Sequence, residues 1–203
     1  MLGVAATGAG TSTVAVAGLA GLVAGAASMA TGEYVSVSSQ RDSESADIAR
    51  EAQEQVAQPR AEAEELKNIY VKRGLDVALA EQVAAQLMRV DPLGAHLRDE
   101  LGLTRDLMAR PGQAAAVSAL SFACGAALPV ATLLVTPGRY RIAGIAVTAL
   151  VLLAGLGALG GMLGGGGRWR AMLRVVVGGG LAMAITGLIG RLVAALGLGG
   201  SPV

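Results

Sequence analysis

Two adjoining stretches of the chain, TVAVAGLAGLVAGAASMATG (residues 13–32) and EYVSVSSQRDSESADIAREAQE (residues 33–54), differ sharply in charge. The first holds twenty residues without a charged side chain, and a helix of about that length crosses the ~30 Å hydrocarbon layer of a bilayer. The second holds six acidic and two basic side chains. The junction therefore predicts that the chain leaves a membrane-spanning helix and enters a water-facing segment.

The same partition of charge extends over the whole chain. Residues 38–113 hold 24 charged side chains in 76 positions, whereas the other 127 positions hold only Glu33 and six arginines. The formal net charge of +1 hides this contrast and indicates no class of partner. Only five aromatic residues accompany 30 glycines, a composition that suits helices packed closely in lipid. We interpret residues 38–113 as a charged insert between membrane-spanning segments.

Four stretches are long and apolar enough to span a membrane: residues 13–32, 114–135, 142–163 and 175 to about 198. Lipid cannot satisfy backbone polar groups, so each is expected to be a helix. Residues 1–12 are too short to span, and we interpret them as a turn preceded by the remnant of a first transmembrane helix. The predicted fold is an all-α polytopic membrane protein with four complete transmembrane helices, a partial first one and a three-helix insert. Its expected divisions are residues 1–12, 13–37, 38–113 and 114–203.

The basic residues in the connections predict the orientation. The insert has ten Lys or Arg side chains and the 164–174 connection has three, whereas the 136–141 connection has two. Cytoplasmic connections carry the excess of Lys and Arg, so the insert is expected in the cytoplasm and the protein in the cell membrane.

Acidic residues of the insert follow a helical period. Glu44, Asp47, Glu51 and Glu54 lie at offsets of 0, 3, 7 and 10, which places four carboxylates on one face of a helix that Pro59 interrupts. Like charges at this spacing repel, unless cations neutralise them. One interpretation is a metal site. The alternative is a solvated face whose charges pair with the nearby basic residues Arg50, Arg60 and Lys67.

A second helix is expected from Arg60, and a third from about Val77 to Val90, where Pro92 limits it. The third helix places Met88 and Asp91 three residues apart on one face. Carboxylates with a thioether favour borderline metals such as ferrous iron or manganese. Taken alone, Met88 fits a hydrophobic core better than a metal site.

Met29 lies in the first predicted span, and Glu33 follows directly after it on the same helical face. An ionisable residue in or beside a span is a functional candidate, because its burial is costly. A desolvated carboxylate near a metal can exchange a proton for the cation, so both residues are candidates for the ion path. The alternative places Glu33 beside Tyr34 among the lipid headgroups. His96 is solitary in a polar stretch and is expected to face solvent.

Several classes of function find no support in the sequence. It contains no nucleophile with an attendant base, no tetrahedral metal motif and no basic patch interleaved with aromatic residues. The glycine-rich residues 155–167 lack the Lys and Ser or Thr of a phosphate-binding loop. An enzyme, a prosthetic group and a nucleic-acid partner are therefore not expected.

Three segments resemble the vacuolar iron transporter family in its bacterial form: GLAGLVAGAASMATGEYVSVSSQRD (residues 18–42), ELKNIYVKRGL (residues 65–75) and SFACGAALP (residues 121–129). The resemblance covers essentially the whole chain. It implies a five-helix protomer in a homodimer that exports or sequesters ferrous iron, and sometimes manganese, in exchange for protons. It also implies that a cytoplasmic three-helix domain gathers metal through glutamates and methionine.

On this resemblance, the expected metal ligands are Glu51, Glu54, Glu62, Glu65, Met88 and Asp91. Asp91, Asn68 and Ala57 depart from the family's pattern. The resemblance implies an acidic residue in the first span, at a position expected to precede Met1. Either the start of the chain is assigned too far downstream, or the chain is a genuine truncation. A second interpretation is therefore a truncated, non-transporting membrane anchor whose insert buffers or senses metal.

Overall fold

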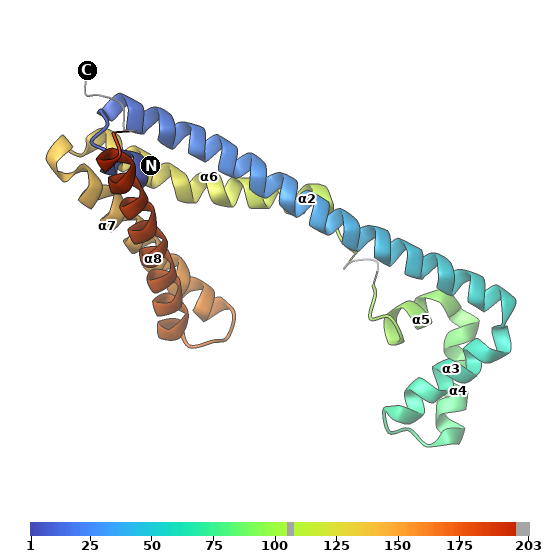
Figure 1. The fold of residues 1–203 in the computed structure, drawn as a ribbon. Helices are drawn as coiled ribbons and strands as arrows, with labels where there is room; N and C mark the ends of the chain where they lie inside the picture. The colour runs from blue at the N-terminus through green and yellow to red at the C-terminus, as the bar shows by residue number, and fades with distance from the viewer. Residues whose placement is uncertain (105–107, 198–203) are drawn as a thin grey trace. The chain divides into compact units, whose positions relative to one another are not determined.

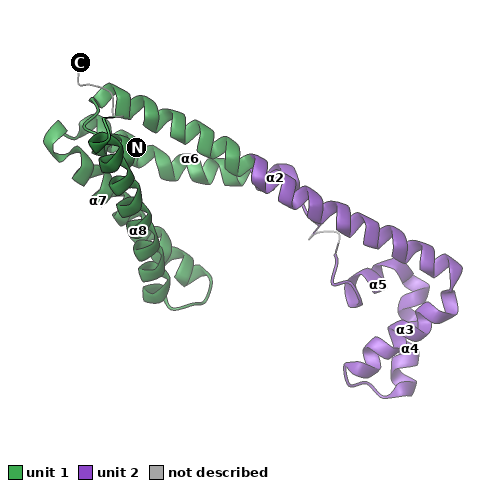
Figure 2. Cartoon of the chain, in the orientation of Figure 1, with its two compact units in different colours: residues 1–30, 116–203 green, residues 31–115 purple. Residues whose placement is uncertain are grey.

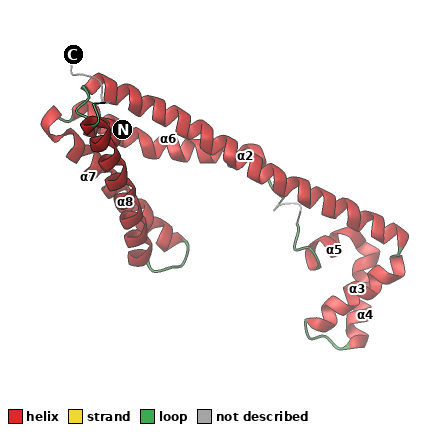
Figure 3. Ribbon diagram, viewed as in Figure 1, coloured by secondary structure: helices red, strands yellow, loops and turns green. Residues whose placement is uncertain are grey.

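A computed structural model describes residues 1–104 and 108–197, and all the regular structure in them is helical (Figures 1 and 3). The elements are α1 (Leu2–Ala6), α2 (Thr11–Ala57), α3 (Pro59–Lys72), α4 (Val77–Val90), α5 (Pro92–Asp99), α6 (Pro111–Val135), the short 3₁₀ helix η2 (Gly138–Tyr140), α7 (Arg141–Leu163) and α8 (Arg168–Ala195). The chain divides into two compact units, which we name the membrane unit (Met1–Ala30 with Ala116–Val203) and the insert unit (Thr31–Ala115) (Figure 2).

Four helices are long and apolar enough to cross a membrane: α2, α6, α7 together with η2, and α8. They contain the first three spans expected from the sequence and the fourth as far as Ala195, which confirms the all-α polytopic fold. The expected end of the last span, at Leu198, lies outside the described residues. The expected boundary between residues 37 and 38 falls inside α2, which runs without a break from Thr11 to Ala57.

The core of the membrane unit forms where α1, α2, α6 and α7 meet. Ala5, Val14, Leu133 and Ile145 are buried there, one from each helix. The short helix α1 also packs along α8. A turn follows α1 at Gly8, whose φ of 83° lies in the left-handed region that glycine tolerates best.

Helices α7 and α8 pack side by side, and small residues allow their backbones to approach closely. A Cβ atom at Gly157 would lie 2.9 Å from Met172 Cα, and one at Gly161 would lie 2.8 Å from Ala171 Cβ. Both positions therefore require glycine for the observed packing. A similar approach occurs on α2, where a Cβ at Gly25 would overlap the ring of Phe122.

The insert unit has its own core, formed by Leu66, Ala84 and Ala95 from α3, α4 and α5. Helix α4 has the bounds expected from the sequence, and Asp76 caps its N-terminus by accepting a hydrogen bond from Leu79 N at 3.0 Å. Helix α5 was not expected. Pro92 ends the preceding helix, as predicted, but it also begins a new one.

The α7–α8 contact gives a first prediction. Gly157→Ala should lower the thermal unfolding temperature of the full-length protein in detergent, because a new methyl group meets backbone and overpacking costs about 1–3 kcal/mol. Gly155→Ala is the matched control, since a Cβ there meets nothing within 4 Å. The control should leave the unfolding temperature unchanged or raise it, because Ala favours helix over Gly. Equal effects of the two substitutions would contradict this packing.

Candidate metal centre

A histidine and three glutamates form a cluster inside the insert unit. His96 on α5 has no exposed surface, and its Nδ1 lies 3.1 Å from Glu51 Oε1, 3.7 Å from Glu62 Oε2 and 3.1 Å from Glu100 Oε2. Glu51 and Glu62 are only 3% and 6% exposed. Donor atoms of Glu51, Glu62 and His96 all lie within 4.8 Å of one another, an arrangement that could hold a metal ion.

Three separate helices bring these side chains together. Glu51 lies in the part of α2 that belongs to the insert unit, Glu62 in the first turn of α3, and His96 in α5. Pro59 occupies the first position of α3, where a missing N–H costs nothing. The break between α2 and α3 lies at Gln58, so the two glutamates belong to different helices although they are close in sequence.

Negative charge dominates this cluster. The pKa of Glu62 is raised, first by burial and then by the nearby charge of Glu51, while His96 opposes the rise. The charges of Glu65 and Glu54 add smaller increments in the same direction. Within residues 1–104 and 108–197, neither Glu51 nor Glu62 forms an ion pair with Lys or Arg. Buried carboxylates in such surroundings favour a bound cation.

The sequence-based expectation for His96 was wrong, because the side chain is buried rather than solvent-facing. The error follows from missing α5. Asp91 accepts a hydrogen bond from Gly94 N at 3.0 Å and caps that helix, with Pro92 at its first turn. The Asp-Pro pair was a usable start signal. Within the described residues, His96 Nε2 is buried and has no hydrogen-bond partner, so one ring nitrogen remains unsatisfied.

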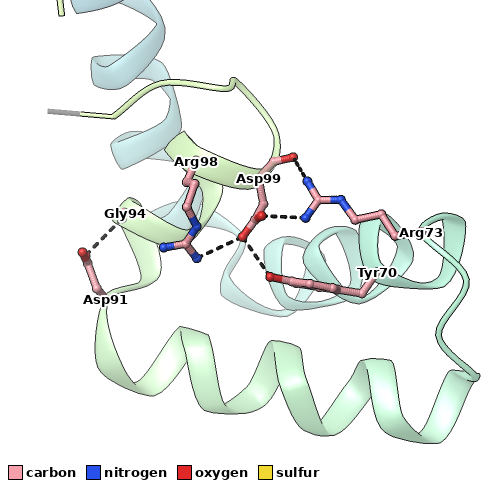
Figure 4. A network of polar contacts seen from close by, with 6 residues as sticks. All are labelled: Tyr70, Arg73, Asp91, Gly94, Arg98 and Asp99. Atoms are coloured by element: carbon pink, nitrogen blue, oxygen red, sulfur yellow. Dashed lines mark hydrogen bonds and ion pairs between the residues drawn. The ribbon is translucent and has the colours of Figure 1, made fainter. Parts of the chain in front are cut away.

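A polar network fixes α5 against α3 (Figure 4). Asp99 accepts hydrogen bonds from Tyr70 Oη at 3.0 Å, Arg73 Nη1 at 2.7 Å and Arg98 Nη2 at 3.0 Å. Arg73 also donates to the Asp99 carbonyl at 2.9 Å. Burial alone would raise the pKa of Asp99, but the hydrogen bonds from Arg73, Arg98 and Tyr70 outweigh it and lower that pKa. This network holds the helix that carries His96.

The other expected ligands lie in different surroundings. Glu54 is half-buried and Glu65 is exposed, and both act on Glu62 through their charge. Met88 packs against the core of Leu66, Ala84 and Ala95, and Asp91 caps α5. The structure thus brings Glu51 and Glu62 together with His96, which sequence reasoning did not select. Metal binding by any of these residues stays a prediction.

Most of the acidic face of α2 is not simply solvated. Glu44 is buried, accepts a hydrogen bond from Ala109 N at 3.0 Å and accepts another from Gln40 Nε2 at 2.8 Å. Asp47 forms an ion pair with Arg50 at 2.6 Å. The interpretation of this face as solvated and paired with basic residues expected Arg50 to form such a pair.

The two residues expected on the ion path, Met29 and Glu33, are both exposed along α2. They lie one helical turn apart, as the sequence spacing implies, and their role stays a prediction.

Comparison with known proteins identifies the family. The model of the VIT family matches residues 1–191. The chain belongs to the VIT family. A protein named vacuolar iron transporter from Acanthamoeba castellanii is 45% identical over 174 residues, which cover 85% of this chain and 67% of the relative. Vacuolar iron transporter homolog 2 from Oryza sativa subsp. japonica is 36% identical over 197 residues, which cover 97% of this chain and 82% of the relative.

A third relative, vacuolar iron transporter homolog 2 from Arabidopsis thaliana, is 32% identical over 199 residues, which cover 98% of this chain and 77% of the relative. These VIT family relatives carry the names of transporters rather than enzymes. Membership of the vacuolar iron transporter family, inferred from residues 18–42, 65–75 and 121–129, is confirmed, whereas its bacterial form stays a prediction.

The Asp99 network gives a second prediction for this VIT family protein. Asp99→Asn should lower hydrogen-exchange protection of α5 amides in the full-length protein by about tenfold, because hydrogen bonds to a charged group are lost. The measurement is made near neutral pH in metal-free buffer. Asp91→Asn is the matched control on the same helix, since Asn caps a helix about as well as Asp.

The effect of Asp99→Asn should depend on pH. The folded pKa of Asp99 lies below its unfolded value, which is about 3.9, so ionisation stabilises the folded state above that value. This contribution is lost as the pH falls through the lower folded pKa. The difference between wild type and variant should therefore shrink in acid. A difference that is the same at all pH values would contradict a role for the Asp99 charge.

Proposed function

We propose that this protein carries a divalent metal ion, Fe²⁺ or Mn²⁺, out of the cytoplasm in exchange for protons, and that its insert unit gathers the ion. The observation that carries the proposal is the buried cluster of Glu51, Glu62 and His96 in a VIT family chain with four candidate membrane spans. The metal is the transported substrate, and no prosthetic group is needed.

Distances between the donor atoms suit an octahedral ion. Ligands about 2.1 Å from such an ion lie about 3 Å from their neighbours in the coordination shell. His96 Nδ1 lies 3.1 Å from Glu51 Oε1 and 3.7 Å from Glu62 Oε2, close to that spacing. A small movement of Glu62 towards His96 would place donor atoms at three of the coordination positions of such an ion.

The types of donor favour borderline metals over hard ones. Carboxylate oxygens alone suit Mg²⁺ or Ca²⁺, whereas an imidazole nitrogen adds affinity for iron and other transition metals. Two buried carboxylates also offset the charge of one divalent ion. Glu54, Glu65, Met88 and Asp91 remain proposed ligands, and the first two could receive the ion at the edge of the cluster.

Glu33 and Met29 are the proposed residues of the membrane path. Among the acidic residues of the chain, only Glu33 lies outside residues 38–113, and it follows directly on an uncharged stretch. A carboxylate there can hold either a proton or part of the charge of a metal ion, which is the requirement of antiport. The distribution of Lys and Arg favours a protein in the cell membrane whose insert lies in the cytoplasm. The family resemblance favours a homodimer.

Metal binding by the insert gives a third prediction. Glu51→Gln combined with Glu62→Gln should weaken Mn²⁺ binding to the full-length protein in detergent by about tenfold or more, measured by titration calorimetry, since two charged ligands are lost. Glu64→Gln is the matched control on α3. It is exposed and pairs with Lys67, so its loss should leave Mn²⁺ affinity unchanged.

A stability measurement separates lost ligands from misfolding. Because the pKa of Glu62 is raised, its ionised form is disfavoured in the folded state. Glu62→Gln should therefore leave the metal-free protein as stable as wild type, or more stable. Unchanged Mn²⁺ affinity in the double variant would remove both residues from the proposed site.

Transport gives a fourth prediction. In proteoliposomes with an imposed pH gradient, the full-length protein should move Fe²⁺ under anaerobic conditions or Mn²⁺, and each flux should fall when the gradient is collapsed. Glu33→Gln should abolish the gradient-driven flux, because an amide cannot exchange a proton. Glu81→Gln, an exposed site on α4, is the control and should transport normally.

Binding without flux is the outcome that would overturn the transport proposal. It would favour the second interpretation, a membrane anchor whose insert buffers or senses metal. Flux that persists in Glu33→Gln would instead leave transport standing and remove Glu33 from the path.

A further inference from the structure

A cavity of about 630 Å³ lies between α7 and α8 in the membrane unit. Its polar side chains are Arg170 and Arg174, from the first two turns of α8. Leu153, Leu156 and Val175 supply apolar lining, and Ala171 with glycines of α7 and of the connection to α8 supplies the rest. The volume lies within the range of pockets that bind small molecules. The cavity thus combines two guanidinium groups with an apolar wall.

The two arginines have no acidic residue to pair with in their own part of the chain. Residues 1–30 and 116–203 contain no Asp or Glu at all. Among the residues that the structure describes, no ion pair involves Arg170 or Arg174. A lipid anion can offset the charge of exposed guanidinium groups at the edge of a membrane, and no carboxylate side chain of this unit competes for them.

The neighbouring tryptophan indicates the depth of these arginines. Trp169 is the single tryptophan of the chain and is 61% exposed, and the guanidinium of Arg168 lies 5.3 Å from its ring centroid. Exposed Trp beside a span is typical of the headgroup level of a bilayer. Arg170 and Arg174 are therefore expected at the level of the lipid phosphates, and α8 continues from them into an apolar segment.

We propose that this cavity binds an anionic phospholipid. The phosphate accepts hydrogen bonds from Arg170 and Arg174, whose planar groups match phosphate oxygens in pairs. One acyl chain lies along Leu153, Leu156 and Val175. Basic pockets between transmembrane helices bind such headgroups in general. The site is separate from the proposed metal cluster and does not rest on metal transport.

Trp169 provides the test, because its fluorescence reports on lipid beside Arg170. The full-length protein is reconstituted in phosphatidylcholine with a fixed fraction of brominated phosphatidylglycerol, or with the same fraction of brominated phosphatidylcholine. Brominated phosphatidylglycerol should quench Trp169 more strongly. The preference should fall about fivefold in Arg170→Gln and more in the double variant with Arg174→Gln, and it should be partly retained in Arg170→Lys, which keeps the charge but loses the paired hydrogen bonds of the guanidinium.

Arg139→Gln is the control, since it removes one exposed cation from the other connection of the membrane unit and should leave the preference unchanged. Thermal unfolding of each variant identifies any that fail to fold. If Arg170→Gln fails to fold, the lipid preference of Arg170→Lys is compared with that of wild type instead. Equal quenching by the two brominated lipids overturns the proposal. So does loss of the preference on addition of millimolar inorganic phosphate, which would assign the arginines to a free anion rather than to a lipid.

Discussion

The cost of placing charge in hydrocarbon governs the whole chain. An acidic side chain at the centre of a bilayer costs at least about 2.5 kcal/mol, and lipid offers it no cation. The membrane unit accordingly contains no Asp or Glu, and it packs through glycine contacts such as that of Gly157 with Met172. Helices held by close approach rather than by bulky side chains need few charges or aromatic groups. All fifteen acidic side chains therefore lie in the insert unit.

Within the insert, two buried acids have opposite surroundings. Asp99 receives hydrogen bonds from two arginines and a tyrosine, and its pKa is lowered. Glu62 lies beside Glu51 with only His96 to oppose the repulsion, and its pKa is raised. A carboxylate that is paired with basic side chains stabilises the fold, whereas a carboxylate without such partners is available to bind a cation. The first fixes α5, and α5 positions His96 in the cluster that contains the second.

The sequence predicts those features that depend on local pattern. Uncharged stretches of about twenty residues located the spans, and Pro92 correctly ended α4. Helix α5 has only eight residues, too few for a clear period, so His96 was misplaced. Its burial depends on Glu51 and Glu62, which are distant in the chain and meet it only after folding. Met88 is the opposite case. Its spacing from Asp91 suggested a metal ligand, but in the structure it packs against the core of the insert unit.

Basic and acidic side chains differ in the counter-ions that a membrane offers them. Arg170 and Arg174 can stand without protein partners because phosphate groups of the lipid are anionic, and long side chains reach the headgroups. A carboxylate in the hydrocarbon layer has no such counterpart and must find a cation or bind a proton. Glu33, at the end of an uncharged stretch, is the acid to which this applies. A group that alternates between a proton and a metal ion satisfies the same constraint that excludes acids from the uncharged stretches.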